Sequence, residues 1–464
     1  MNWLKWVAQS KKIINLFHEN YELIKSITLT LLILLSLVLT WSLWTFKPSY
    51  STIEDARTVK KQEVVDEKDL TDVVRPTQVI YHKESQIYGA EASPIIEEFH
   101  KGLKDTKFTV DTTKIETFEP DEKIGLNNSY IEVIYPVNMT QDIYKGLFKF
   151  NSASGPDNVD RIFLYQDKDT DGIEGYLVSY QSKKMQKIKA LNNALIPFIK
   201  GMGSSINNGD FVSYMKYDLE RRKDNGESEI TKRLYFPAEK ISLNRYNYLS
   251  NSPNQDTYEM YKKALFKDPL AVKSATSDNK ITYADGTAAM VVNTLQNRFS
   301  YKSFTGMSNI NPTPTSPLSQ SIRYINTHAG WGNPYILSNV TGRTTGSTEF
   351  WLFVESLPVL DSNMQMSLKW NYGELQEYNR SMVQLDLSEI PSSQSSITLP
   401  SGKAVIEKVE SESNTNNIKD IRIGYTMEKR ETLYTLVPRW FINYENSNMG
   451  YEQLRFKQGR EEGF

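Results

Sequence analysis

Residues 26–46 read SITLTLLILLSLVLTWSLWTF, and this stretch decides how the rest of the chain is organised. It lies between Lys25 and Lys47 and contains no charged side chain. At 1.5 Å per residue, about 21 helical residues span about 31 Å, which matches the hydrocarbon core of a bilayer. The pattern therefore predicts a transmembrane helix over 26–46.

Aromatic side chains gather at the C-terminal end of this predicted helix. We expect Trp41, Trp44 and Phe46 to lie at the membrane–water interface, and Pro48 to end the helix. A cleavable signal peptide has a shorter apolar core of about 7–15 residues, followed by a small-residue cleavage site. The sequence FKPSYSTIE (46–54) offers no such site. The segment is therefore expected to stay in the protein as an anchor in membrane lipid.

Basic residues flank the predicted helix on both sides, so the positive-inside rule, by which Lys and Arg gather on the cytoplasmic side, does not decide its orientation. The short segment before the helix favours a cytoplasmic N-terminus, with the rest of the chain after the helix outside the cytoplasm. With one predicted span, the protein is expected to be a single-pass protein of the cell membrane. Apolar residues recur at helical spacing within residues 1–25. This cytoplasmic segment is either an amphipathic helix on the inner leaflet or a plain tail.

One face of the predicted helix carries a stripe that could contact another helix. Its members recur at steps of three and four residues and therefore share a face; they are Ser26, Thr30, Ile33, Leu37, Thr40 and Trp44. Small hydroxyl residues let two helices approach closely and can hydrogen-bond within lipid. The alternative is that each hydroxyl donates to a carbonyl of its own helix. The stripe is the candidate helix–helix interface.

The composition argues against several classes of protein. The chain has 54 Lys and Arg against 56 Asp and Glu, without the basic excess of a nucleic-acid-binding protein. It has no Cys and only four scattered His, which excludes disulfides, thiolate nucleophiles and a local ligand cluster for a metal. We therefore expect no cofactor, no metal site and no nucleic-acid partner.

The remainder is expected to be a three-domain extracytoplasmic region of the α+β class, strand-rich towards the C-terminus. The first part alternates strands and helices, the later parts are richer in strands, and a Pro-, Ser- and Thr-rich stretch separates them. The expected divisions are a juxtamembrane connector at 47–75, domains at 76–210, 211–310 and 321–450, a linker at 311–320 and a charged tail at 451–464.

Two motifs suggest chemistry but are incomplete. Residues 167–172 (DKDTDG) match the first half of a calcium loop, yet the twelfth position is Val178 in place of the required Glu. A polar hairpin turn is the preferred interpretation.

Ser213 and Lys216 fit S-x-x-K, and residues 277–279 (SDN) imitate a second element of penicillin-binding serine enzymes. The third element, K-[ST]-G, is absent, so we interpret this match as coincidence.

Two long stretches together resemble a known family. Residues 24–50 (IKSITLTLLILLSLVLTWSLWTFKPSY) resemble the anchor of the YycH family, and residues 421–444 (IRIGYTMEKRETLYTLVPRWFINY) are similar to its closing strands. The hairpin at 161–180 lies where that family has one. The resemblance extends from about residue 22 to about residue 445, and the order and spacing of these segments carry it.

This resemblance implies a non-enzymatic regulator of an envelope and cell-wall two-component system. Such a protein would act with its relative YycI, through transmembrane-helix contact with the sensor histidine kinase WalK (YycG). Two alternatives remain open. One is an exported scaffold for wall assembly, and the other is an extracytoplasmic serine or glycan-cleaving enzyme, for which no catalytic residues can be named.

Overall fold

A computed structural model of the chain describes residues 21–45, 67–90, 94–121, 124, 129–150, 155–223, 226–249, 252–304, 315–387, 395–412, 417–430, 433–445 and 450–456. The chain forms two compact units, Met1–Glu63 and Val64–Phe464. The expected segment 1–20, residues 46–66 with Phe46, and the end of the charged tail (457–464) lie outside the described residues.

The first unit contains helix α2 (Tyr21–Thr45), which is 25 residues long. It has neither Gly nor Pro, and its Leu, Ile and Val side chains from Ile27 to Leu39 are each 53–63% exposed. The helix begins five residues before the expected start at Ser26. Among the helices that the structure describes, none has the combined length and hydropathy of a membrane crossing.

Sheet 1 occupies the first part of the second unit and has nine antiparallel strands in the order β3-β7-β6-β5-β4-β1-β2-β8-β9. The strands are β1 (Gln78–Lys83), β2 (Gln86–Gly89), β3 (Phe108–Thr117), β4 (Tyr130–Thr140), β5 (Asn158–Gln166), β6 (Ile173–Ser179), β7 (Lys184–Ala190), β8 (Val212–Arg222) and β9 (Ser228–Pro237). Alternation along β5 separates the two faces: Ile162 and Leu164 enter the main core, whereas Phe163 enters a smaller one behind the sheet.

Four helices pack with the main-core side of sheet 1. They are α3 (Leu70–Val73), α4 (Pro94–Asp105), α5 (Gln141–Phe148) and α6 (Ile196–Asn207). The ring centroids of Phe99 of α4 and Phe198 of α6 lie 4.5 Å apart; Phe99 belongs to the main core, and the partly buried Phe198 packs against it. In the sequence, Pro94 after Ser93 predicts a helix over 93–105 and Thr140 predicts one over 141–150; α4 and α5 confirm both, although α5 ends at Phe148. Pro197 lies in the first turn of α6, where proline is tolerated, and does not interrupt the helix.

Sheet 2 combines one strand from the middle of the chain with strands from its end. β10 (Ile241–Leu249) pairs with β20 (Ser395–Leu399) and with β22 (Leu433–Tyr444), which also pairs with β21 (Ile418–Arg430) and β23 (Tyr451–Gln453). Helix α9 (Gly402–Glu412) follows β20. Trp440 of β22 is 1% exposed, and its indole donates to the carbonyl of Pro400 over 3.0 Å.

Sheet 3 is built entirely from residues between β10 and β20, so it is an insertion into sheet 2. Its order is β11-β12-β13-β14-β19-β18-β16-β15, with β17 paired to β16. The strands are β11 (Lys273–Ser277), β12 (Lys280–Ala284), β13 (Ala288–Asn293), β14 (Arg298–Ser303), β15 (Tyr335–Gly342), β16 (Thr345–Val354), β17 (Leu357–Pro358), β18 (Met366–Asn371) and β19 (Glu374–Ser381). Helices α7 (Gln255–Leu265) and α8 (Pro317–Thr327) accompany them.

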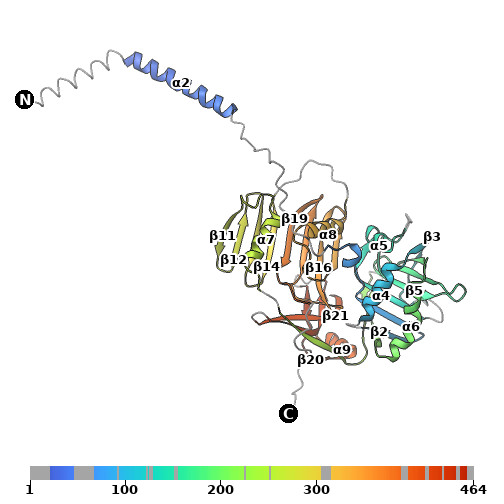
Figure 1. The fold of residues 1–464 in the computed structure, drawn as a ribbon. Coiled ribbons are helices and arrows are strands. Elements are labelled where there is room, and N and C mark those ends of the chain that lie inside the picture. Colours follow the sequence, from blue (N-terminus) through green and yellow to red (C-terminus); the bar gives the residue numbers. More distant parts are fainter. Residues whose placement is uncertain are drawn as a thin grey trace, which may run out of the picture. The chain divides into compact units, whose positions relative to one another are not determined.

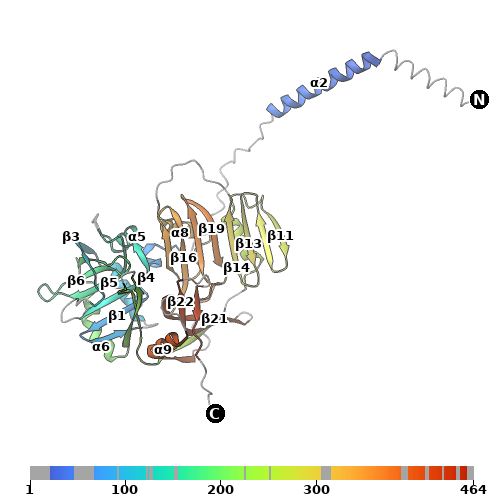
Figure 2. The same ribbon diagram turned by 180° about the vertical axis from the view of Figure 1, so that it is seen from behind.

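Figures 1 and 2 show these three groups in the second unit: sheet 1 with α4 to α6, sheet 3 with α7 and α8, and sheet 2 between the lower ends of the two. The α+β class and the strand-rich C-terminal part are confirmed. The strand pairings, however, group residues differently from the expected domains. Strands β8 and β9, expected to begin a second domain at 211, continue sheet 1, and residues 317–320 of the expected linker belong to α8.

Two further local expectations are corrected. The sequence of 381–390 (SMVQLDLSEI) is typical of a strand, but β19 ends at Ser381 and the chain has no regular structure from 382 to 387. The sequence of 396–410 (SITLPSGKAVIEKVE) also predicts a strand, but the observed strand ends at Leu399, and α9 follows. Gly402, Val405 and Val409 of α9 are buried at steps of three and four residues while Glu407 is exposed, which is helical and not strand periodicity.

Candidate functional site

Helix α2 carries the stripe predicted from the sequence, and two of its hydroxyls are already engaged. Thr30 Oγ1 donates to the carbonyl of Ser26 over 2.8 Å. Thr40 Oγ1 donates in the same way to the carbonyl of Ser36 over 2.8 Å. This is the alternative that the sequence left open: each hydroxyl satisfies a carbonyl of its own helix. A contact along this face would therefore use shape more than hydrogen bonds from these two threonines.

The other stripe members add mainly apolar surface. Ile33 and Leu37 are 53% and 60% exposed, and Trp41, an expected interface anchor, is 75% exposed. Trp44 lies on the backbone of α2, but its side chain is outside the description, as is all of Phe46. Whether the stripe contacts another helix stays a prediction.

The calcium-like motif folds as the preferred hairpin turn. Asp167 accepts hydrogen bonds from the backbone of Asp169 and the hydroxyl of Thr170, while Asp171 pairs with Lys200 over 3.2 Å. These bonds close the turn between β5 and β6. In the part of the chain that the structure describes, no group of three or more acidic or His residues could hold a metal ion.

The serine-enzyme motif is dispersed. Ser213 and Lys216 lie in β8 of sheet 1, where an offset of three residues directs them to opposite faces, and Lys216 pairs with Asp121 over 3.0 Å. Ser277 ends β11 in sheet 3, and the residues after it form the turn to β12. Ser213 and Lys216 therefore do not face each other, and the two elements of the motif belong to different sheets.

A buried charge cluster, absent from the sequence-based expectations, lies inside sheet 1. Glu132 of β4 and Arg161 of β5 form an ion pair, and each is 1% exposed. The second carboxylate oxygen of Glu132 accepts from Tyr235 over 2.6 Å and lies 3.0 Å from His82 Nε2. Burial alone would raise the pKa of Glu132, but Arg161 and His82 lower it to about 2. Glu132 is thus a fixed negative charge in the core.

Arg161 extends this cluster towards the edge of sheet 1. Its guanidinium donates to the carbonyl of Arg233 on β9 over 2.5 Å. Arg233 is itself paired with Asp218 over 2.6 Å and with Asp121 over 2.8 Å. Asp160, next along β5, has its carboxylate 3.6 Å from Arg161 Nε, and burial raises the pKa of Asp160. Every one of these charges has a partner, as buried charges require.

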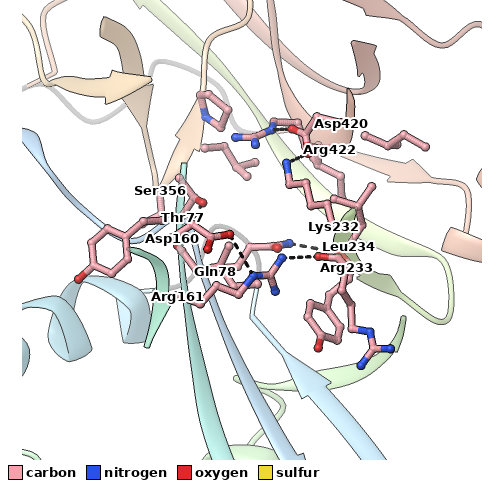
Figure 3. A pocket seen from close by; sticks show the side chains of 17 residues that line it. Thr77, Gln78, Asp160, Arg161, Lys232, Arg233, Leu234, Ser356, Asp420 and Arg422 are labelled. Atoms are coloured by element: carbon pink, nitrogen blue, oxygen red, sulfur yellow. Dashed lines mark hydrogen bonds and ion pairs between the residues drawn. The ribbon is translucent and has the colours of Figure 1, made fainter. Parts of the chain in front are cut away.

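A second ion network joins sheet 1 to sheet 2. Lys232 of β9 reaches Asp420 of β21 over 2.7 Å, and Asp420 also accepts from Arg422 and from Tyr451, each over 2.5 Å. Burial alone would raise the pKa of Asp420, but Arg422 and Lys232 hold it well below its usual range. Figure 3 shows Lys232, Asp420 and Arg422 on one side of a small cavity of about 50 Å3, with Asp160 and Arg161 on the other.

A much larger groove of about 880 Å3 opens beside this network. We call it the junction groove because all three sheets contribute to its wall. Sheet 1, with the turn between β6 and β7, supplies residues 135–138, 180, 181, 183, 229, 231 and 232. Sheet 3 supplies 338–340 together with Trp351, and sheet 2 supplies residues 418–420, Arg422 and Tyr451. The sequence did not predict this site, since its walls come from strands that are distant along the chain.

Comparisons with known proteins agree with the resemblance seen in the sequence. Residues 22–197 match the family described as "YycH protein, N-terminal domain", and residues 231–458 match "YycH protein, C-terminal domain". The chain belongs to the YycH family. It is also 22% identical, over 90% of its own length and 94% of the relative, to the "Two-component system WalR/WalK regulatory protein YycH" of Bacillus subtilis.

The fold of this YycH family member has a solved counterpart. The crystal structure of YycH from Bacillus subtilis aligns with a TM-score of 0.64 at 17% identity, covering 84% of this chain and 98% of that chain. At this identity the likeness shows the fold alone. The N-terminal family match begins within α2 and ends within α6, and the C-terminal match begins within β9. Lys232 and Asp420 therefore both lie in the C-terminal match, whereas Arg161 lies in the N-terminal match.

Proposed function

We propose that this chain is a membrane-anchored, non-enzymatic regulator of the sensor histidine kinase in a WalR/WalK-type two-component system. The observation that carries the proposal is the match to both YycH family domains, together with a relative that is named as a regulatory protein of that system. Because this relative aligns over 90% of the chain, its role is proposed for the whole protein rather than for one part.

Helix α2 would be the membrane anchor, with the N-terminus in the cytoplasm. The proposal is supported by the uncharged run 26–46, which makes up most of α2, and by the exposure of its apolar side chains. A helix that exposes this much apolar surface is stable only when lipid or protein covers it. Trp41, Trp44 and Phe46 would then mark the outer interface.

Regulation would follow from a difference in how α2 packs beside the kinase helices in two signalling states. A partner shifts such an equilibrium only by the difference in its affinity for the two states, and about 1–3 kcal/mol changes the ratio 5- to 150-fold. Thr30 and Thr40 hydrogen-bond within α2. The difference in affinity for the two signalling states of the kinase would therefore come mainly from the shape of the helix face around Ile33 and Leu37. YycI is the second proposed partner, on the strength of the family resemblance.

The test compares alanine substitutions on two opposite faces of α2. Ile33→Ala with Leu37→Ala removes bulk from the stripe, and Leu31→Ala with Leu35→Ala removes the same bulk from another face. We expect the first pair to change the autophosphorylation rate of the kinase, reconstituted with the full chain in liposomes, at least fivefold relative to the wild type. The second pair should leave the rate within twofold. Equal effects of the two pairs would contradict recognition through the stripe.

Anchoring itself is tested separately by fractionation. The full chain should remain with the membranes after alkaline carbonate extraction, and an alkaline phosphatase fusion at Phe464 should be active outside the cell. Recovery of a shortened chain that lacks residues 26–46, and that still regulates the kinase, would overturn the anchor proposal. An inactive fusion at Phe464 would reverse the proposed orientation.

A further inference from the structure

The junction groove is bordered by strands that end their sheets. Among the described strands, β9 is the last of sheet 1, β15 is the last of sheet 3 and β21 is the last of sheet 2. A terminal strand presents backbone N–H and C=O groups along its outer edge. Three such edges converge on one groove, and this arrangement is unusual for a surface that meets only water.

The residues that line the groove show that the edges of β15 and β21 are turned towards it, whereas β8 and β16 line it with alternate residues of one face. Residues of a strand alternate between the two faces of the sheet, so a groove over one face is lined by every second residue. Here Ser338, Asn339 and Val340 of β15 all line the groove, as do residues 418–420 of β21. Because neighbouring residues of each of these strands all line the groove, the backbone of the strand itself forms part of the groove wall.

Breaks in the strand registers coincide with the groove. The described strands contain six register irregularities. Four of them include or bracket residues of the groove wall: Ile134/Met139, Leu219/Glu220, Leu337/Asn339 and Ile418/Asp420. A bulge leaves a residue outside the ladder and turns the local backbone, and bulges concentrate at sheet edges and next to binding sites.

Positive and negative side chains nearly balance in the groove wall, with five Lys and Arg against six Asp and Glu. Asp420 binds both Lys232 and Arg422, and Arg221 pairs with Glu445 over 2.9 Å. The remaining wall is rich in primary amides, each of which can both donate and accept hydrogen bonds; they are Asn138, Gln181, Asn339, Gln365 and Asn443. Asn138 donates to Gln181 and Gln365 donates to Glu349, which leaves each of these amides further hydrogen-bonding capacity. This chemistry suits an uncharged ligand that carries many amide groups.

We infer that the junction groove binds an uncharged, extended peptide segment, which adds as a strand to β15 or to residues 418–422 of β21. The groove volume of about 880 Å3 lies at the upper end of the range for ligand sites. Backbone hydrogen bonds to the edge would hold the peptide, and alternate side chains would enter the wall beside Trp351 and Tyr451. β9 is the weaker edge, because Lys183 Nζ already donates to the carbonyl of Ile230.

The test uses the full chain in detergent micelles and a pool of capped nine-residue peptides made only of uncharged residues. We expect peptides to be enriched with dissociation constants below 1 mM. On binding, exchange of backbone amides in 337–340 or 418–422 should slow at least tenfold, while exchange in β11 stays unchanged. The readout is binding to the purified chain, so it does not depend on the proposed regulation of a kinase.

A ligand-side control separates backbone recognition from side-chain recognition. The tightest peptide is resynthesised with N-methyl groups on its odd residues, or on its even residues. A strand added to an edge points alternate N–H groups towards that edge, so at least one of the two versions should lose tenfold or more in affinity. If neither version loses affinity, strand addition is wrong.

A protein-side control separates the groove from other surfaces. Asn339→Trp fills the groove from β15 and should weaken peptide binding at least tenfold, whereas Asn208→Trp, at the exposed end of α6, should not. Gln365→Ala with Asn443→Ala is the milder pair should the Trp variant fail to fold. Absence of binding by any peptide of the pool, or binding by a tetramer of N-acetylglucosamine alone, would overturn the inference.

Discussion

At the scale of single residues, buried polar groups are the most informative feature of the second unit. His100 of α4 is 8% exposed, and its Nε2 lies 3.0 Å from the carbonyl of Thr71. Because a carbonyl only accepts, Nε2 carries the proton. Nδ1 is buried without a hydrogen-bond partner among the described residues. Burial, together with the nearby positive charge of Arg75, lowers the pKa of His100 to about 4.

We expect His100 to make the protein less stable in mild acid. In the unfolded chain the imidazole takes up a proton near pH 6.5, but in the folded protein it does so only near pH 4. The unfolded state therefore binds more protons in this window, and the free energy of unfolding falls as the pH is lowered from about 6.5 to about 4, by on the order of 3 kcal/mol. Urea unfolding at pH 7 and at pH 4.5 measures this change.

The matched variant for this prediction is His100→Gln, which can still donate to Thr71 but does not titrate. Its stability should be lower than that of the wild type at pH 7 and should fall less on acidification. An identical pH dependence in the two proteins would show that other groups, such as the carboxylates around Arg161, dominate in this range.

At the scale of elements, two hairpins of sheet 3 use the same turn with different residues. Val354 pairs with Leu357, and the two residues between them, Glu355 and Ser356, have φ values of 48° and 63°. Between β18 and β19, Tyr372 and Gly373 have φ values of 47° and 88°. Two positive φ values in a two-residue loop define a turn that favours glycine at its second position.

Ser356→Gly should therefore stabilise the protein, and Gly373→Ala should destabilise it. The left-handed conformation costs a residue with a Cβ about 1 kcal/mol, so we expect changes of about this size and of opposite sign. The midpoint of urea unfolding, with an unchanged slope, measures both. A loss of stability in Ser356→Gly would mean that the serine side chain, which borders the small cavity, contributes more than the backbone strain costs.

At the scale of the whole molecule, Asp420 ties sheet 2 to sheet 1. It receives Lys232 from sheet 1 and Arg422 and Tyr451 from sheet 2. Asp420→Ala leaves two cations without their acceptor, and such a loss typically costs about 3–5 kcal/mol. Since the pKa of Asp420 is held below its usual range, its contribution is present at neutral pH and is lost as the pH falls below about 3.8.

The double variant Asp420→Leu with Lys232→Met is the control for this prediction. It removes the bridge without leaving Lys232 unpaired, so it should cost less than Asp420→Ala alone. A double-mutant cycle on the free energy of unfolding, completed with the single variants Asp420→Leu and Lys232→Met, isolates the coupling. A coupling energy near zero would mean that Arg422 and Tyr451 alone hold Asp420 and that this bridge does not connect the sheets.

Much of the local structure could be predicted because its signals are local. The hairpin at Asp171-Gly172, the N-terminus of α5 at Thr140 and the long strands β21 and β22 follow from turn residues, capping residues and alternation. Helix α9 was missed because a short segment rich in Val and Ile suits a strand equally well by propensity. The start of α8 was missed because Pro317, interpreted as part of a linker, also suits the first turn of a helix.

The sequence alone determined the uncharged run of α2, the lack of thiol chemistry and the resemblance to the YycH family, because each depends on residues that are adjacent or recur in a fixed order. Only the tertiary structure decided that β8 and β9 complete sheet 1, that sheet 3 interrupts sheet 2, and that Glu132 meets Arg161 inside the core. These pairings join residues that are far apart in the sequence. They depend on which strand edges and charged side chains come together when the chain folds, and the local periodicity of the sequence does not determine this.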